Sequence, residues 1–473
     1  MTAEIVTEKT SEQKKPQLNY IKTRDDADIV IFEEVETGKF KVSPGTKCSW
    51  INDGQEFTER ELRPRIEPWL TSLFQSEHLS LLAGSGLTHA VHYLATGNGA
   101  ASMGASIPFS RFANEIIYAA KVSAKDTERK EGNIEDQIRV ANELLRGLEI
   151  LCDSNADIIR SELINALGEF SDSILKSETG IAIAPEESRE KAFNILINFL
   201  MSFASRTGTR DRLNIFTTNY DRLIEAGAEL AGLHLLDRFL GNLMPVFRSS
   251  RLDLDMHYNP PGIRGEPRYL EGVTRFTKLH GSVDWVQTGK DIRRIGLPFG
   301  ADSVEPYLNA PVLKEATAHQ LMIYPNSAKD RETAAYPYVE LFRDFAAATC
   351  RPNSTLVTYG YSFGDEHINR IIEDMLTIPS THLVIISYDD PLGRIIKTYE
   401  KIGRNPQITL LVGNHLGDLK TLTEHYLPKS AIDKATFRMS ELLKQRFGTQ
   451  HTEATVISPA PGINDDLPLD ELV

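Results

Sequence analysis

The stretch Leu213-Asn214-Ile215-Phe216-Thr217-Thr218-Asn219-Tyr220-Asp221 begins as an apolar run and ends in polar side chains. Such a run predicts a buried strand. The stretch Val273 to Ser282 repeats the arrangement, because apolar residues there precede His280-Gly281-Ser282. Open α/β sheets bind their ligands where strands end. With an amide, a carboxylate and an imidazole between them, the two strand ends predict a site for a polar reaction.

A third stretch indicates the ligand. Leu79 to Ala83 is predicted to be a short apolar strand, and it runs directly into Gly84-Ser85-Gly86-Leu87-Thr88. Glycines remove Cβ atoms and let a phosphate approach the backbone, where the amides of the turn and of a following helix can bind it. The third glycine of a Gly-x-Gly-x-x-Gly fingerprint is missing. An ordinary strand-to-helix turn is therefore the alternative interpretation.

These three segments together resemble the sirtuin-like superfamily. The family's Gly-Ala-Gly-x-Ser loop is matched by Gly84 to Thr88, and its Thr-x-Asn-x-Asp segment by Thr217, Asn219 and Asp221. Its catalytic histidine, in a His-Gly-Ser context, is matched by His280. A late Gly-x-Ser-hydrophobic segment near the adenosine ribose is matched by Gly360-Tyr361-Ser362-Phe363, after an apolar strand at Thr355 to Tyr359. The motifs keep the family's order, and the resemblance spans about residues 79 to 415.

The composition limits the functional classes. The chain has 473 residues, a formal net charge of −14 and 41% hydrophobic residues. The negative balance argues against direct nucleic-acid binding, which needs clustered Lys and Arg. The three cysteines, Cys48, Cys152 and Cys350, include no Cys-x-x-Cys pair, so we expect no disulfide framework, no zinc ribbon and no bound metal. We expect a cytoplasmic protein for three reasons. The thiols are expected to be free, the N-terminus is polar and lacks a signal peptide, and no apolar run is long enough to span a membrane.

The order of the elements predicts one large α/β domain over residues 76–430. Apolar strands at 79–83, 321–324, 355–359, 383–387 and 408–412 join those of the first paragraph and alternate with helices at 223–231, 338–348 and 366–375. This alternation predicts a doubly wound, Rossmann-like parallel sheet. About one hundred residues with helical periodicity, 110–207, form a predicted helical insertion into that sheet. In sirtuin-like proteins such an insertion forms one wall of the cofactor cleft.

The remaining segments are predicted to be peripheral. Residues 1–75 form an N-terminal extension, loose to about residue 26 and followed by a β-hairpin over 27–42, with Cys48 to Ile51 completing a small β element. This element either packs on the main domain or contacts a partner. The stretch from residue 231 to Glu271 contains several prolines and glycines, which predict an irregular structure, and it also contains arginines. We expect a C-terminal helix at 431–447 and an acidic, disordered tail at 448–473.

The resemblance implies a role for each matched residue. Asn219 can hydrogen-bond ribose hydroxyls or a water, and His280 can act as a base, since an imidazole titrates near neutral pH. Asp221 can bind the nicotinamide carboxamide, hold a neighbouring side chain or simply cap the helix that starts near Arg222. The other histidines, including His367, have no comparable motif. Cofactor contacts are expected from Gly84, Ser85, Gly86, Thr88, Thr218, Gly281, Gly360, Ser362 and Phe363.

Two further segments are weaker matches to the family. Ile107-Pro108-Phe109 resembles a Gly-Ile-Pro segment that covers the cofactor, which makes Pro108 a candidate contact. Asn133-Ile134-Glu135-Asp136 resembles an Asn-Ile-Glu segment near the cleft, so Glu135 is also a candidate. The start of a helix, capped by Asn133, is an equally sufficient explanation of the second segment.

The family resemblance implies NAD as the substrate and cleavage of its nicotinamide–ribose bond. Protein deacylases of the superfamily usually carry a four-cysteine zinc module and a Phe-Arg pair. This chain lacks the module and has Phe109-Ser110-Arg111. Its helix-rich, zinc-less pattern resembles bacterial antiviral effectors that hydrolyse NAD to ADP-ribose and nicotinamide. We therefore expect an NAD+ hydrolase that acts in anti-phage defence by NAD depletion. The expected assembly is a homo-oligomer with a DNA-translocase-type ATPase as partner. A protein deacylase or ADP-ribosyltransferase and a non-catalytic NAD-binding sensor are the alternatives.

Overall fold

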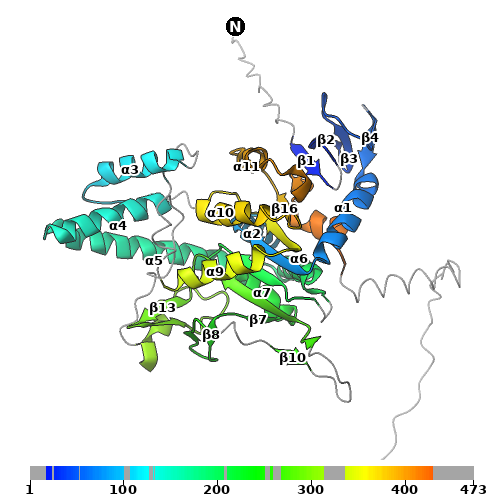
Figure 1. Ribbon diagram of the computed structural model, residues 1–473. Coiled ribbons are helices and arrows are strands. Elements are labelled where there is room, and N and C mark those ends of the chain that lie inside the picture. Colours follow the sequence, from blue (N-terminus) through cyan, green and yellow to red (C-terminus); the bar gives the residue numbers. More distant parts are fainter. Residues whose placement is uncertain are drawn as a thin grey trace, which may run out of the picture. The chain divides into compact units, whose positions relative to one another are not determined.

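The computed structural model describes residues 17–23, 26–52, 54–100, 107–126, 132, 134–206, 210–250, 256–258, 268–313 and 336–429. Its centre is an eleven-stranded sheet in the order β4-β3-β2-β1-β17-β16-β15-β5-β6-β12-β7 (Figure 1). The strands from β17 to β7 are parallel to one another. They span β5 (His78–Ala83), β6 (Asn214–Thr217), β7 (His234–Leu236), β12 (Val273–Lys278), β15 (Ser354–Tyr359), β16 (His382–Ser387) and β17 (Ile408–Val412).

The parallel sheet grows in two directions from β5. The chain first adds β6, β7 and β12 on one side of this strand, and later adds β15, β16 and β17 on the other side. The order therefore reverses between β5 and β15. In open α/β sheets, ligands bind outside the carboxyl ends of the strands at such a reversal.

Helices cover both faces of the sheet because strand residues alternate between two cores. In β5, Leu81 belongs to one buried cluster and Leu82 to the other. The Leu81 cluster is completed by α1 (Glu59–Phe74), α2 (Ser85–Thr96), α6 (Glu186–Ala204), α7 (Leu223–Leu230) and η5 (Leu422–Tyr426). The Leu82 cluster is completed by α9 (Tyr338–Thr349), α10 (Glu366–Leu376) and α11 (Arg394–Ile402). The predicted doubly wound, Rossmann-like α/β class is confirmed.

The helical insertion has two parts. Helices α3 (Ala113–Asp126), α4 (Ile134–Ile150) and the first half of α5 (Asn155–Ala182) share a separate buried cluster, and Figure 1 shows these three helices next to one another. Helix α6 instead packs on the main sheet, because Leu196, Phe199 and Leu200 belong to the Leu81 cluster. The prediction of helices over this stretch is confirmed. Its last helix is a layer of the main fold and not part of an added subdomain.

The N-terminal hairpin is confirmed as β2 (Val30–Glu36) and β3 (Lys39–Val42), and β4 (Glu56–Thr58) pairs beside it. Two expectations were wrong. Residues 18–22, predicted loose, form β1 (Leu18–Lys22), which joins the hairpin to β17. Residues 48–51 form no strand. The polar residues of β1 are bonded within the protein: Lys22 Nζ donates to the carbonyl of Asn405 at 2.7 Å, and Asn19 Oδ1 accepts from the amide of His415 at 3.0 Å.

The stretch after residue 231 is more regular than predicted. Its described parts include β7 at the edge of the main sheet, the paired strands β10 (His257–Tyr258) and β11 (Arg268–Tyr269), and β8 (Phe239–Leu240) with β9 (Val246–Phe247). The last two join β13 (Trp285–Thr288) and β14 (Asp291–Arg294) in a four-stranded sheet. Strands of two or three residues are too short to show a period in sequence.

The shorter helical elements are η2 (Glu305–Asn309), η3 (Pro311–Leu313), η4 (Asn405–Gln407) and α12 (Leu419–Thr421). No helix in the described part of the chain is long and apolar enough to cross a membrane. The predicted strand at 321–324, helix at 431–447 and tail at 448–473 lie outside the described residues.

Candidate functional site

The four sequence motifs lie at the carboxyl ends of four adjacent strands. Gly84 follows β5, Thr218 follows β6, Leu279 follows β12 and Gly360 follows β15. These strands stand in the order β15-β5-β6-β12, so the motifs meet at the point where the strand order reverses. The structure therefore brings together segments that are up to 280 residues apart in sequence. This is the edge of the sheet where the fold predicts ligand binding.

The glycines of the first and last motifs pack against each other. The amide of Gly84 donates to the carbonyl of Tyr359 at 2.9 Å, and the amide of Gly86 donates to that of Gly360 at 3.1 Å. A Cβ on Gly84 would lie 2.4 Å from the Gly360 carbonyl oxygen, and one on Gly86 would lie 2.6 Å from the Gly360 Cα. Close packing of two loops is thus sufficient to require glycine here. Phosphate binding, the functional interpretation of these residues, remains a prediction.

Asn219 is fixed to the glycine loop by its own amide group. Its side-chain Nδ2 donates to the Gly84 carbonyl and to Thr88 Oγ1, both at 2.9 Å, and the side chain is buried. Its backbone amide donates to Thr217 Oγ1 at 3.0 Å. The amide of the neighbouring Thr218 donates to the carbonyl of Ala83 at 3.3 Å. Strand β6 therefore delivers Asn219 to the start of α2 in a defined orientation.

Asp221 has protein partners on both carboxylate oxygens. Oδ1 accepts from the amide of Leu223 at 3.1 Å, at the first residue of α7, and Oδ2 accepts from Thr88 Oγ1 at 2.6 Å. The capping interpretation is what the geometry shows. Through Thr88, which also accepts from Asn219, the carboxylate helps to orient the asparagine. In this structure Asp221 therefore affects the site indirectly, through its hydrogen bonds to Thr88 and to the Leu223 amide.

His280 is only 1% exposed and lies against a second histidine. Its Nε2 is 3.4 Å from Nε2 of His367, and the two rings are 5.6 Å apart. His367 lies in the first turn of α10, and its ring packs edge-on against Phe342 at 4.7 Å. Sequence reasoning missed His367, which had no motif around it. The available signal was its position, two residues after the Gly360–Asp365 segment that ends beside the glycine loop.

The chain around His280 is tied to the Asn219 loop. Gly281 has a φ of +84°, so the chain turns sharply after the histidine. The carbonyl of Tyr220 then accepts from Ser282 Oγ at 3.2 Å and from the amide of Val283 at 3.1 Å. The Tyr220 ring is 6.3 Å from that of His280. The two loops that hold Asn219 and His280 are therefore built as one unit.

The weaker family matches lie beside this unit. Tyr220 shares a buried cluster with Ile107 and Phe109, while Pro108 between them is exposed. The Gly-Ile-Pro-like segment thus packs on the residue next to Asn219. Glu135 is the second residue of α4, and its side chain lies outside the described residues.

The loop after β15 is anchored to the helix that carries His367. The Phe363 carbonyl accepts from Asn369 Nδ2 at 3.0 Å, and Tyr361 donates its hydroxyl to Asn369 Oδ1 at 3.0 Å. Phe363 is buried and has a φ of +54°. Ser362 and Ser85, on the two packed glycine loops, are both exposed. They are therefore accessible to a ligand at the carboxyl edge.

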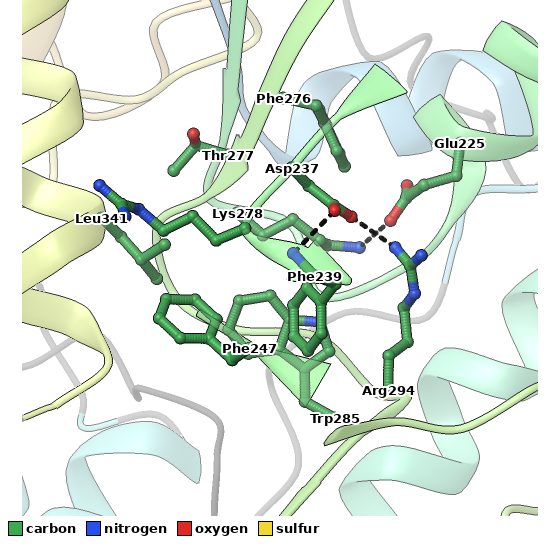
Figure 2. Close-up of a pocket in the computed structure, with 11 residues that line it drawn as sticks. Glu225, Asp237, Phe239, Phe247, Phe276, Thr277, Lys278, Trp285, Arg294 and Leu341 are labelled. Atoms are coloured by element: carbon green, nitrogen blue, oxygen red, sulfur yellow. Dashed lines mark hydrogen bonds and ion pairs between the residues drawn. The ribbon is translucent and has the colours of Figure 1, made fainter. Parts of the chain in front are cut away.

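A buried charge cluster lies next to the Asn219 loop. Lys278, the last residue of β12, pairs with Glu225 of α7 at 2.9 Å, and Arg294 pairs with Asp237 at 2.6 Å (Figure 2). These pairs and the rings of Phe239 and Trp285 line a cavity of about 10 Å³, which is room for about one water molecule. None of the predicted site residues lines it.

Burial raises the pKa of Glu225 to about 7, and the nearby Asp284 carboxylate adds to this while Lys278 opposes it. Glu225 Oε2 is buried without a hydrogen-bond partner among the described residues. In those residues no group of three or more His, Cys, Asp and Glu side chains is placed to hold a metal ion.

The comparisons with known proteins agree with this arrangement. A family model described as a SIR2-like domain matches residues 213–408. This match supports a sirtuin-like family for this part of the chain. The matched residues include Asn219, His280 and Ser362 but not the Gly84 loop. Proteins of the SIR2-like family use NAD.

One solved structure, described as the structural basis of sirtuin substrate affinity, shares 11% identity with this chain. The likeness covers 79% of this chain and 98% of the other, with a TM-score of 0.31. No curated protein matches the chain.

The glycine packing predicts a large stability difference between two similar substitutions. Gly86→Ala places a methyl group against the Gly360 backbone, so we expect a loss of about 1–3 kcal/mol or more in the free energy of unfolding. Gly168→Ala, in α5, meets no atom within 4 Å and should stabilise the protein by up to about 1 kcal/mol. Chemical denaturation of both variants measures this difference. Equal stabilities would contradict the packing role of Gly86.

The Glu225 carboxyl predicts a pH dependence of stability. Its pKa is about 7 in the folded protein against an ordinary value of 4.5, so between these values the folded state holds a proton that the unfolded state has released. The contribution of Glu225 to the free energy of unfolding is therefore most favourable below pH 4.5. About 3 kcal/mol of this free energy is lost as the pH rises to 7. Glu225→Gln should flatten this part of the curve. Urea unfolding from pH 4.5 to 8 tests it, with the exposed Glu373→Gln as control; an unchanged slope would show that the carboxyl titrates normally.

Proposed function

We propose that the protein is an NAD+ hydrolase that cleaves NAD to nicotinamide and ADP-ribose. The observation that supports it most is the joining of Asn219 and His280 in one unit. Two hydrogen bonds to the Tyr220 carbonyl connect their loops, and Asn219 also bonds the glycine loop at the reversal of strand order. An amide and an imidazole held together at this edge suit the chemistry of a ribose. The SIR2-like match over residues 213–408 supports NAD as the ligand.

The proposed reaction needs little acid catalysis from the protein. Nicotinamide leaves as a neutral molecule, and the transition state has oxocarbenium character, as in glycoside cleavage. Asn219 positions a ribose hydroxyl or the attacking water through its Oδ1 acceptor, since both Nδ2 hydrogens bond Gly84 and Thr88. His280 takes a proton through its imidazole. A hydroxyl that reaches His280 Nε2 replaces the contact with His367.

The low exposure of the site supports a further part of this proposal, that the site is inactive until a signal arrives. His280 and Asn219 are 1% and 8% exposed, so substrate entry requires neighbouring groups to move. We infer that a trigger opens the site, in keeping with an effector of anti-phage defence that depletes NAD in the cytoplasm. We also propose a homo-oligomer and a translocase-type ATPase partner. Tyr118 and Val122, one helical turn apart on α3 and 72% and 45% exposed, offer an apolar strip for a subunit contact.

The assignment predicts three separable kinetic effects. His280→Ala and Asn219→Ala should each lower nicotinamide release on the order of a hundredfold or more, because a positioned base or its partner is lost. Ser362→Ala should mainly raise KM, since this exposed serine is expected to contact the distant adenosine ribose. His425→Ala, an exposed histidine of η5, is the matched control and should behave like the parent.

Nicotinamide, ADP-ribose and cyclic products are quantified over a range of NAD concentrations under activating conditions, with and without an acyl-peptide. Near-normal turnover by the His280 and Asn219 variants would show that these residues are wrongly assigned. Product formation only with acyl-peptide would favour the deacylase alternative. NAD binding without turnover in the parent would favour the sensor.

A further inference from the structure

Lys278 opens the Lys-Leu-His-Gly-Ser motif, yet the proposed reaction gives it no role. Its side chain is only 3% exposed although it carries a cation. A buried ammonium is costly unless it is paired and hydrogen-bonded, so its partners show what holds it there. The Nζ atom donates to the Asp221 carbonyl, lies 3.5 Å from the Tyr220 carbonyl and pairs with Glu225 Oε1 at 2.9 Å.

These partners belong to the segment that carries Asn219. The two carbonyls follow Asn219 by one and two residues, while Lys278 precedes His280 by two residues on β12. The ammonium therefore connects the strand that leads to the histidine with the loop that holds the asparagine. Figure 2 shows its long side chain reaching Glu225 on α7, whose start is capped by Asp221. One cation thus joins a strand, a loop and a helix.

We propose that Lys278 is a positioning residue of the site. Its ammonium holds the Tyr220 and Asp221 carbonyls so that Asn219 and His280 keep the spacing that the reaction needs. Glu225 Oε1 accepts from the ammonium and, when the carboxyl is ionised, supplies its countercharge. This inference rests on the proposed NAD hydrolysis and names a residue required for it.

The test separates positioning from simple stability. Above pH 7, where Glu225 is ionised, Lys278→Met leaves the carboxylate buried without its cation, so this variant should lose both stability and turnover. In Lys278→Met/Glu225→Gln both charges are gone, and stability should return toward that of the parent. Turnover should not return, because the Asp221 carbonyl is still not held by the ammonium and the Tyr220 carbonyl keeps only its bonds to Ser282 and Val283. We expect kcat to stay lowered about tenfold or more, with a smaller effect on KM, since small misplacements in a site are costly.

The matched control is an exposed pair of the same chemistry. Lys401 and Glu373 lie 2.8 Å apart with 74% and 39% of their side chains exposed, so Lys401→Met/Glu373→Gln should keep parental turnover. If the Lys278/Glu225 double variant does not fold, Lys278→Leu/Glu225→Leu gives an apolar version of the same test. Recovery of turnover together with stability in either double variant would overturn the proposal. Parental turnover in Lys278→Met would also overturn it.

A second measurement does not depend on hydrolysis. Hydrogen exchange of the amides at 217–223 should be faster in the folded double variant than in the parent, while exchange in β15 and β16 stays the same. If the parent releases no nicotinamide under activating conditions, the proposed function fails, and this exchange result alone decides whether Lys278 holds the loop. Unchanged exchange at 217–223 would then reject the positioning role.

Discussion

The backbone contact between the Gly84–Gly86 turn and Gly360 is the constraint on which the site depends. Strands β5 and β15 pair along six residues, and their chains must leave the sheet side by side. Both turns would clash if either carried a Cβ, since the added atoms would lie 2.4 to 2.6 Å from backbone atoms of the other. Because this contact brings the two loops together, it also fixes where α2 and the loop leading to α10 begin.

The polar groups of the site form a chain of hydrogen bonds that starts at that contact. The Gly84 carbonyl accepts from Asn219, Thr88 of α2 accepts from the same side chain, and Asp221 accepts from Thr88. On the other side, α10 places His367 against His280. Asn219, which follows β6, and His280, which follows β12, are thus positioned by helices that come after β5 and β15. This dependence explains why motifs far apart in sequence form one site.

The sequence predicted the long elements and the strand ends at which the candidate site residues meet. Strands such as β5, β16 and β17 are mostly apolar because both faces are buried, and the polar residues after β6 and β12 mark their ends. It failed where the signal depends on tertiary contacts. Strand β1 looked like a polar segment because Asn19 and Lys22 are buried on partners almost 400 residues away. His367 is a site neighbour only because α10 starts beside the glycine loop.

The role of Lys278 could not be predicted for a related reason. Lysine at a strand end usually indicates a solvent-facing position, since its ammonium is rarely buried without partners. Here those partners are two backbone carbonyls and a glutamate on α7, and main-chain carbonyls leave no trace in a sequence. The stretch from Lys278 to Ser282 contains one residue that a sequence motif identifies and one that only the structure identifies. Its histidine was visible as a motif, and its lysine becomes informative only with the fold.

The histidine pair adds a chemical constraint of its own. A neutral imidazole has one N–H donor and one acceptor nitrogen, whereas an imidazolium has two donors and no acceptor. Two Nε2 atoms 3.4 Å apart can share a hydrogen bond only if one ring presents its acceptor nitrogen, so at least one of the two rings is unprotonated in this arrangement. An unprotonated His280 can take up a proton from a hydroxyl that displaces His367 from its Nε2. Burial excludes water from competing for that contact, and the pair therefore supports the use of His280 as a base.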